Sequence, residues 1–507
     1  MPAVNISDLA ATDWDAVVVG TGLGGATLGL VLARHGKRVL FVEKGRDLGL
    51  EKAAIRGHVV EADPLFGGSH EDQREALRRG GRRVDEVEIG GLPVRPELGN
   101  GTGGSSALHG GVLERFFPGD FAAWPITYRD LVPWYARAEE LYGVKGERDP
   151  LRVEAGAPLA APIPAGAATE ALRAALTERG LHPYRLPLAC RAVPDCSACQ
   201  GFLCARACKN DADRMALRPA LALGASLATG CEAVSLEASP SRVTGVACVM
   251  DGRSATLRAG VVVLAAGALA TPALLLASRP GGWDRGLANG SGLVGRNLMR
   301  HGIDLWALPG APRLGHPGDA KALGFNDLYE TPRGKLGTVQ SFGTLPALEA
   351  VLAHRSPVLR LLAPFARALW PVLSAVPILA TILEDLPQTS NRLEFAEGRP
   401  RITYRPSPDD ERRRAIFREE LRPRLAGLRP VLVSGRDAPK ALGHVCGTCR
   451  FGEDPATSVL DPWNRAHGLD NLYVVDGSFF PTSAGINPAL TIAANALRVG
   501  EHLAERM

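Results

Sequence analysis

The clearest pattern of apolar and polar positions lies near the start of the chain, in "DAVVVGTGLGGATLGLVLARHGKRVLFVEKG", residues 15–45. The run "AVVVG" is too short and too β-branched for a helix. "ATLGLVLARHG" has the apolar spacing of a helix and stops at Gly36, a typical helix C-cap. "KRVLFVEKG" is then a second apolar strand. This pattern predicts a β-α-β unit of about thirty residues.

The same kind of pattern returns later in the chain. "GVVVLAAGALATPALLLAS" predicts a buried strand, a turn of small residues and a helix, and the tail "NLYVVDGSFFPTSAGINPALTIAANALRVGEHL" predicts a strand, a loop and a long helix. Between about residues 303 and 429 the glycine turns disappear. There "NRLEFAEGRPRITYR" alternates apolar and polar residues around a turn, which is typical of an antiparallel hairpin.

We therefore expect an α/β protein with a discontinuous first domain built from both ends of the chain. A second domain with a mainly antiparallel sheet and helices should interrupt it. The expected divisions are residues 1–302 with inserted helical and cysteine-rich segments, 303–440, and a return to the first domain at 441–507.

Composition and charge exclude some functions. The 507 residues are 46% hydrophobic and 22% charged, as in soluble globular proteins. Lys and Arg number 58 against 54 acids, without a long basic tract, so a nucleic-acid partner is not expected. The start "MPAVNISDLAATDWD" has neither the basic nor the apolar part of a secretory signal, which predicts a cytoplasmic location.

One apolar stretch, "PVLRLLAPFARALWPVLSAVPILATIL" at residues 357–383, is long enough to suggest a membrane span. Arg360, Arg367 and three interrupting prolines argue against a span. A substrate lid, a subunit contact and a membrane-surface helix remain open for this stretch, so association with a membrane remains open too.

The first β-α-β unit carries a recognisable chemical motif. Gly20, Gly22 and Gly25 are spaced G-x-G-x-x-G between the strand and the helix, and Glu43 ends the second strand. Glycines at this spacing let backbone N–H groups approach a pyrophosphate at a helix N-terminus, while the acid accepts hydrogen bonds from a ribose hydroxyl. A carboxylate there argues against NADP. The unit by itself leaves NAD and FAD open.

Several segments resemble the glucose-methanol-choline (GMC) family of FAD-dependent oxidoreductases. They are "GHVCGTCRFGEDPATSVLDPWNRAHGLDNLYVVDGSFFPTSAGINPALTIAANALRVGEHL", "GALATPALLLAS", "GGSSALHGG" and "WPITYRDLVPWYARAEELYGV". The resemblance covers most of the chain except the cysteine-rich region and about residues 303–383. It implies a Rossmann-like FAD-binding domain plus a substrate-binding domain. The implied reaction is oxidation of a small-molecule alcohol to a carbonyl, with oxygen or another acceptor taking the electrons; lyase or decarboxylase chemistry on the same fold is the alternative.

The resemblance also implies roles for single residues. His444 would take the hydroxyl proton of an alcohol, and Asn487 would hydrogen-bond the same oxygen. Asn487 precedes Pro488 and also fits a helix N-cap. The residues implied to contact the FAD are Gly20, Gly22, Leu23, Gly24, Gly25, Glu43, Lys44, Gly99, Gly103, Gly104, Ser105, Ser106, His109, Gly110, Val234, Ala266, Gly267, Asp476, Gly477, Asn487, Pro488 and Thr491.

Two features depart from the family pattern. His109 stands where much of the family has asparagine, and Leu108 stands where members with histidyl-linked flavin have their histidine, which favours non-covalent FAD. The cysteines at 190, 196, 199, 204 and 208 have one C-x2-C spacing, but thiols or a disulfide are favoured over a metal or iron-sulfur centre. Cys446 and Cys449 are expected to be buried packing residues beside the flavin.

Overall fold

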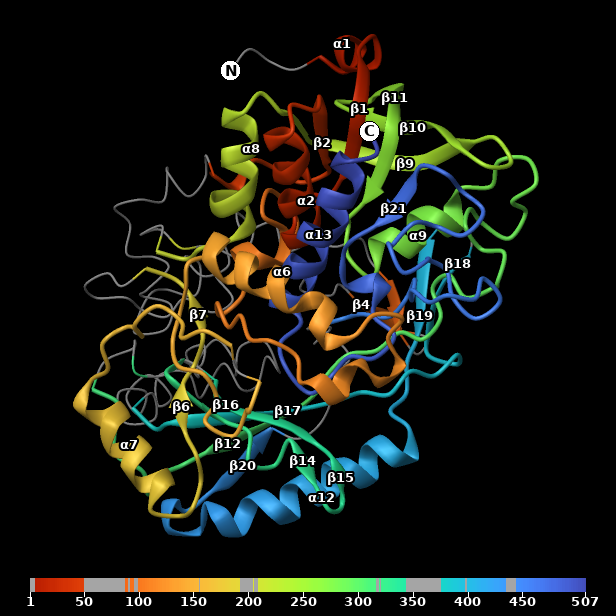
Figure 1. The fold of residues 1–507 in the computed structure, drawn as a ribbon. Helices are drawn as coiled ribbons and strands as arrows, with labels where there is room; N and C mark the ends of the chain where they lie inside the picture. Colours follow the sequence, from red (N-terminus) through yellow and green to blue (C-terminus); the bar gives the residue numbers. More distant parts are fainter. Residues whose placement is uncertain are drawn as a thin grey trace, which may run out of the picture.

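The computed structural model of the 507-residue chain describes residues 5–49, 87–89, 92–94, 99–154, 156–191, 204, 208–315, 319, 321–342, 375–396, 399–434 and 444–507. Residues 357–374 of the apolar stretch, Cys196 and Cys199 lie outside these ranges. Figure 1 shows two main bodies of secondary structure, one above the other, which are organised by separate sheets.

The first sheet has seven strands and is mixed in direction. Its order is β8-β2-β1-β11-β10-β9, with β21 also paired to β11. Strands β8, β2, β1, β11 and β21 run parallel at their contacts, whereas β11, β10 and β9 form an antiparallel meander. The bounds are β1 Asp13–Val19, β2 Val39–Glu43, β8 Ser226–Thr229, β9 Cys231–Ala238, β10 Val243–Met250, β11 Arg253–Leu264 and β21 Leu472–Val474.

Both faces of β1 are buried along Ala16–Val19, which explains why this strand reads as an uninterrupted apolar run. Val17 and Val19 belong to one core, while Ala16 and Val18 belong to the core on the opposite face. The second core includes helices α2 (Leu23–Arg34) and α13 (Ala489–Ala504), which lie side by side over β1 and β2 (Figure 1). A helix from the start of the chain and the helix at its end thus share one core.

The second sheet is antiparallel and has six strands in the order β20-β12-β17-β16-β13-β6. Helices α7 (Ala167–Thr177) and α12 (Pro408–Arg424) supply side chains to its core. The α12 helix starts with a capping box between Ser407 and Asp410. The strands are β6 Tyr184–Arg185, β12 Gly302–Ala307, β13 Leu323–Phe325, β16 Gly337–Ser341, β17 Ile378–Leu383 and β20 Val431–Ser434.

Two findings bear on the expected divisions of the chain. α7 and β6 come from residues before 303 but belong with the second sheet, because α7 supplies apolar side chains to its core and β6 pairs with β13. Ile378–Leu383, the end of the apolar stretch, is the buried strand β17 between β12 and β16. That part of the stretch is therefore neither a lid nor a membrane-surface helix. The boundaries at 302 and 440 stay predictions.

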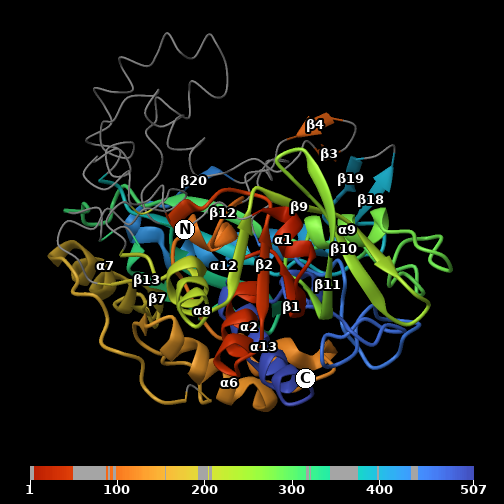
Figure 2. The same ribbon diagram turned by 90° about the horizontal axis from the view of Figure 1, so that it is seen from above.

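The expected hairpin is present, but it belongs to a third sheet. Its strands β18 and β19 pair antiparallel, and β19 continues parallel to β3 in a four-stranded sheet β18-β19-β3-β4. This sheet and α7 lie on opposite sides of the molecule when it is viewed from above (Figure 2). The strands are β3 Val87–Ile89, β4 Leu92–Val94, β18 Arg392–Ala396 and β19 Arg399–Thr403.

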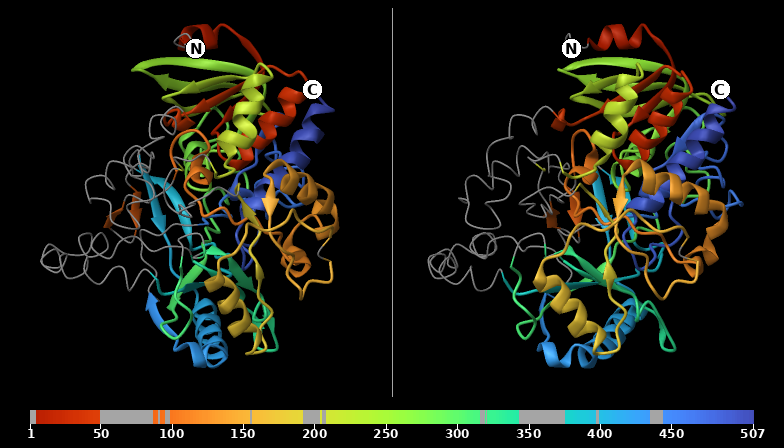
Figure 3. Two further views of the ribbon diagram at one scale, coloured as in Figure 1. Left: turned by 90° about the vertical axis from the view of Figure 1, so that its left-hand side faces the viewer. Right: turned by 60° about the vertical axis from the view of Figure 1, so that its left-hand side comes forward.

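The remaining elements connect these layers. α6 packs on α13 and begins with the capping box of Thr127 and Asp130 that its sequence predicts. α1 and the C-terminal end of α13 lie at the same end of the molecule (Figure 3). The bounds are α1 Ile6–Ala10, η2 Gly104–Ala107, η3 Pro118–Ala123, α6 Tyr128–Leu141, β5 Val144–Lys145, β7 Leu188–Ala189, η4 Asp213–Leu217, α8 Arg218–Ala222, α9 Ala270–Ala277, β14 Glu330–Thr331, β15 Gly334–Lys335, η7 Ala426–Leu428 and η8 Gly477–Phe479.

Candidate active site

The glycine loop after β1 is shaped by close backbone contacts. Gly20 has a φ of +97°, and a Cβ there would lie 2.4 Å from the carbonyl oxygen of Ala265, just after β11. A Cβ at Gly24 would lie 2.2 Å from the carbonyl oxygen of Val475. At Gly22, by contrast, a Cβ would meet no described atom within 4 Å. The loop therefore leaves room at Gly22, at the N-terminus of α2, where backbone N–H groups can bind an anion.

The second glycine-rich loop, residues 99–111, lies against the first. A Cβ at Gly104 would lie 3.1 Å from the Cα of Gly22, so the two predicted cofactor segments meet. Gly103, with a φ of +85°, precedes the short 3₁₀ helix η2 within this segment. The glycines let the chain turn tightly enough for this helix. The Ser106 hydroxyl donates to the Gly103 carbonyl at 2.6 Å and accepts from the N–H of Ala212, so it stabilises the loop.

Glu43 lies at the end of β2 as predicted, and each of its carboxylate oxygens accepts two hydrogen bonds. One oxygen accepts from the N–H and hydroxyl of Thr21, at 3.2 and 2.7 Å. The other accepts from the N–H groups of Gly45 and Gly101, at 2.9 and 3.2 Å. Glu43 therefore ties both glycine loops to β2, and a ribose hydroxyl would have to replace one of these donors.

Val234 and Lys44 flank the same end of β2. The Val234 side chain is 44% exposed on β9, and Lys44 lies 3.9 Å from Glu232. An apolar side chain left open beside the end of β2 fits the predicted position for an adenine.

Asp476 joins the C-terminal segment to the turn after β11. One carboxylate oxygen accepts from the N–H of Gly267 at 2.8 Å and the hydroxyl of Thr271 at 2.5 Å, and the other accepts from the N–H of Ser478 at 2.8 Å. Ala266 donates its N–H to the Thr271 hydroxyl at 3.2 Å. These bonds hold Ala266, Gly267, Asp476 and Gly477 together beside the glycine loop.

The predicted catalytic pair lies close together. Nε2 of His444 is 3.4 Å from Nδ2 of Asn487. The side-chain oxygen of Asn487 and Nε2 of His109 are buried without a hydrogen-bond partner among the described residues. Buried polar atoms normally have partners, so these two atoms are suited to contact a bound molecule. The arrangement of His444, Asn487 and His109 thus fits a cofactor and substrate site.

The start of α13 differs in detail from the sequence expectation. The helix begins at Ala489, and Pro488, rather than Asn487, occupies the N-cap position. The Asn487 side chain turns toward His444 instead of capping the helix, since its amide is within reach of the imidazole. The hydroxyl of Thr491 shares a hydrogen bond of 2.8 Å with Tyr135 on α6, so it anchors the helix.

A second histidine contacts His444 and was not identified from the sequence. Nδ1 of His301 lies 2.8 Å from Nδ1 of His444, and Nε2 of His301 lies 3.2 and 2.9 Å from the carbonyl oxygens of Ser483 and Ala484. His301 stands just before β12, and no local pattern in "NLMRHGID" marks it.

The site is electropositive. Burial, followed by the charges of His301, Lys321 and His109, lowers the pKa of His444 well below its usual value. Burial, with the charges of Lys209 and Lys321, lowers the pKa of His109 to about 3. Burial and Lys209 lower the pKa of Lys321 to about 7. The imidazoles are therefore neutral near pH 7, so His444 can accept a proton and the positive surroundings favour negative charge on a substrate oxygen.

The cysteines give no metal centre among the residues that the structure describes. The sulfurs of Cys204 and Cys208 are buried and lie 3.1 Å apart. Cys446 and Cys449 are buried, and burial raises their thiol pKa values well above the usual range, as expected for packing residues.

No helix within the described ranges is both long and apolar enough to cross a membrane.

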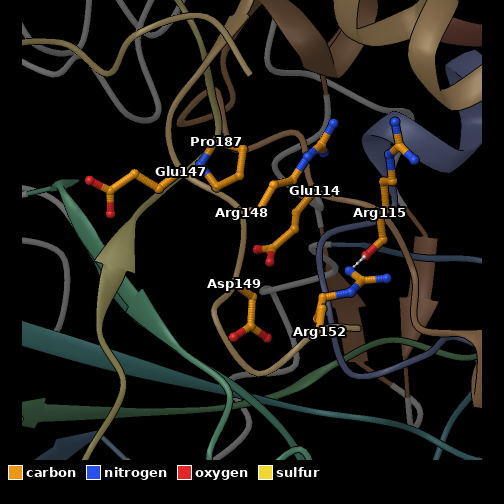
Figure 4. A pocket seen from close by; sticks show the side chains of 7 residues that line it. All are labelled: Glu114, Arg115, Glu147, Arg148, Asp149, Arg152 and Pro187. Carbon is orange, nitrogen blue, oxygen red and sulfur yellow. Dashed lines mark hydrogen bonds between the residues drawn. The ribbon is translucent and has the colours of Figure 1, made fainter. Parts of the chain in front are cut away.

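A separate polar cluster, largely buried, lines a small pocket together with Pro187 (Figure 4). Tyr184 donates to Glu114 at 2.6 Å, and Asn326 donates to Asp149 at 3.0 Å. Burial raises the pKa of Glu114 to about 7. Arg152 donates to the Arg115 carbonyl at 2.8 Å, the dashed line in Figure 4. Because these side chains bond one another and the backbone, we assign the cluster a structural role.

Several known proteins are similar to this chain over almost its whole length. The 6'''-hydroxyparomomycin C oxidase of Streptomyces lividus is 32% identical, over 97% of this chain and 92% of its own. The paromamine 6'-oxidase of Streptomyces fradiae is 31% identical, over 97% and 91%. The 2-methyl-1,2-propanediol dehydrogenase of Mycolicibacterium austroafricanum is 27% identical, over 98% and 96%.

The fold also matches a solved structure. Pyridoxine 4-oxidase from Mesorbium loti superposes with a TM-score of 0.63 at 22% identity, covering 96% of this chain and 99% of that one. Two family models described as GMC oxidoreductase match residues 15–303 and 390–496. These segments include both glycine loops, His444 and Asn487. The chain therefore belongs to the GMC oxidoreductases, an enzyme family whose membership implies FAD as the cofactor.

Proposed function

We propose that this protein oxidises the CH–OH group of a small-molecule alcohol to a carbonyl, with His444 as the base and Asn487 as the residue that orients the alcohol. The observation that carries the proposal is the 3.4 Å approach of His444 Nε2 to Asn487 Nδ2, beside an Asn487 oxygen that lacks a partner among the described residues. One alcohol oxygen placed between the two side chains can give its proton to the imidazole and accept from the amide.

The residues around the glycine loops fit FAD. The open space at Gly22 and the uncapped start of α2 suit a pyrophosphate. The exposed Val234 beside Glu43 suits an adenosine. His109, with its unpartnered Nε2, suits the edge of the flavin ring. When bound, FAD supplies a hydride acceptor at N5. We also propose that the other residues named above from the family resemblance contact the FAD, and that the FAD is bound non-covalently.

The protein's own groups prepare the alcohol for hydride loss. His444 holds the hydroxyl proton at Nε2, and the neutral form required for this is favoured by burial. Lys321, whose pKa is about 7, keeps part of its positive charge near pH 7 and stabilises negative charge on the alcohol oxygen beside His444. The α13 helix directs the positive end of its dipole toward the same region, because its N-terminus directly follows Asn487.

The substrate class is open between polar and lipophilic alcohols. If the apolar stretch at 357–383 lined the substrate entry, it would favour a lipophilic alcohol, but its last six residues are the buried strand β17. Two relatives that align along almost the whole chain are named as oxidases of paromamine and of 6'''-hydroxyparomomycin C. We therefore propose a hydroxyl group of an amino sugar as the first substrate to test. A terpenoid alcohol and a sterol represent the lipophilic alternative.

The proposal is tested on purified protein. It should be yellow, release FAD on denaturation, and lose its oxidised-flavin absorbance when mixed anaerobically with an alcohol substrate. Readmitting oxygen, or adding an artificial acceptor, distinguishes an oxidase from a dehydrogenase. A protein that cannot be reconstituted with FAD would contradict the cofactor assignment. A flavoprotein whose flavin no alcohol reduces would instead favour lyase or decarboxylase chemistry.

A further inference from the structure

The two imidazoles of His301 and His444 are joined through their Nδ1 atoms, which lie 2.8 Å apart. Such a bond needs one donor and one acceptor, and a neutral imidazole carries a hydrogen on only one of its nitrogens. The tautomer of one ring therefore determines the tautomer of the other.

The backbone determines the tautomer of His301. Its Nε2 lies 3.2 and 2.9 Å from the carbonyl oxygens of Ser483 and Ala484, and carbonyl oxygens only accept hydrogen bonds. Nε2 of His301 must therefore carry the hydrogen. Burial and the charge of Lys335 lower the pKa of His301 to about 4, against the opposing effect of the two carbonyls, so the ring is neutral near pH 7. Nδ1 of His301 is then an acceptor.

We propose that His301 is a positioning residue that holds His444 as the Nδ1–H tautomer, leaving the Nε2 lone pair directed at the substrate hydroxyl. The acceptor at His301 Nδ1 requires His444 Nδ1 to donate. His444 Nε2, on the side of Asn487, then has the lone pair that a base needs. The inference rests on the proposed function of His444 as base.

The backbone around the pair is consistent with a fixed arrangement. His444 has a φ of +61° and Ala484 a φ of +55°, in the left-handed region that L-residues with a Cβ seldom adopt. Strained backbone persists where the surrounding structure determines it. Here it places the His444 ring at Nδ1 of His301 and the Ala484 carbonyl at Nε2 of His301.

Two variants separate positioning from packing. His301→Asn places an amide oxygen near the position of Nδ1, so it can still accept from His444. His301→Gln extends an amide toward the carbonyls of Ser483 and Ala484 but removes the acceptor at Nδ1. Anaerobic flavin reduction by excess alcohol should slow less than about tenfold in the asparagine variant. In the glutamine variant it should slow by about a hundredfold to ten-thousandfold, the loss typical of a general base in the wrong tautomer.

A spectroscopic readout is independent of activity. In the holoenzyme with ¹⁵N-labelled histidine, nitrogen shifts and couplings identify the protonated ring nitrogen, and His444 is assigned by its loss in His444→Gln. We expect Nδ1–H at His444 in the parent protein and in His301→Asn, and a shift toward Nε2–H in His301→Gln. Nε2–H in the parent protein, or the same tautomer in all three proteins, would overturn the proposal. If the variants fail to fold, the protonated ring nitrogen of His444 in the parent protein alone decides whether the proposal holds. If His444→Ala retains its rate while the tautomer is as expected, the function of His444 fails but the role of His301 in fixing its tautomer stands.

Discussion

Nε2 of His444 and Nδ2 of Asn487 lie 3.4 Å apart, although 43 positions of sequence separate the two residues. His444 is held in a left-handed backbone conformation, and Asn487 stands directly before Pro488 at the start of α13. The hydrogen bonds of Asp476 tie the chain between them to the turn after β11. One alcohol oxygen can therefore contact both side chains, in a site anchored to the cofactor-binding sheet.

The glycine loop offers a matched pair of variants. Gly22→Ala places a methyl group in open space at a φ of −68°, which alanine tolerates, so folding stability should change by less than about 1 kcal/mol. The same methyl group stands where the pyrophosphate would bind. FAD affinity should therefore fall about tenfold or more, equal to at least about 1.4 kcal/mol. Titration of the apoprotein with FAD, followed by flavin fluorescence, measures this.

Gly24→Ala is the control, because its Cβ would lie 2.2 Å from the Val475 carbonyl oxygen. This variant should lose folding stability even without FAD. Equal FAD affinity in Gly22→Ala and the parent protein would show that the pyrophosphate does not bind at Gly22.

Glu139 on α6 holds two buried or partly buried arginines. Arg115 donates to it twice at 2.7 Å, and Arg148 donates at 2.6 and 2.7 Å. Glu139→Ala leaves both guanidinium groups without this carboxylate, so we expect a loss of about 3–5 kcal/mol in the free energy of unfolding. Denaturant unfolding measures the loss, and Glu140→Ala, on the exposed side of α6, should change stability by less than about 0.5 kcal/mol. Similar midpoints for the two variants would contradict this account of Glu139.

Glu114 should make stability depend on pH. Burial raises its pKa from 4.5 to about 7 in the folded protein. Between these pH values the folded protein keeps a proton that the unfolded chain has lost, so this group lowers the free energy of unfolding as the pH rises from 4.5 to 7. The expected decrease is up to about 3 kcal/mol, at 1.36 kcal/mol per pKa unit.

Glu114→Gln removes this dependence while keeping an oxygen that can accept from Tyr184. The melting temperature of the variant, relative to the parent protein, should rise between pH 4.5 and 7. A constant difference across this range would show that Glu114 does not titrate in the way its burial implies.

Local patterns in the sequence predicted the local parts of the fold. The apolar runs around Gly20 and the hairpin at 392–403 depend on contacts between near neighbours, and both are present. The stretch 378–383 was misread because an apolar run is compatible with a lid, a helix or a buried strand. Its pairing with β12 and β16, from distant parts of the chain, decides in favour of a strand.

The residues of the candidate site were likewise only partly predictable from the sequence. Resemblance identified His444 and Asn487, and the fold brings them together. His301 and Lys321 were missed because isolated histidines and lysines carry no periodic or motif signal, and only the tertiary structure brings them near His444. The N-cap assigned to Asn487 was wrong because its amide lies beside His444, with Pro488 in the cap position.

The most direct test of the account is the rate of anaerobic flavin reduction in His444→Ala with excess alcohol. We expect this variant to retain FAD and its melting temperature but to reduce its flavin about a hundred to ten thousand times more slowly than the parent protein, as expected on removal of a general base. Asn487→Ala should lose less, because it removes a hydrogen bond and leaves the base in place. If His444→Ala reduces its flavin as fast as the parent protein, His444 is not the base, and His109 becomes the next residue to test.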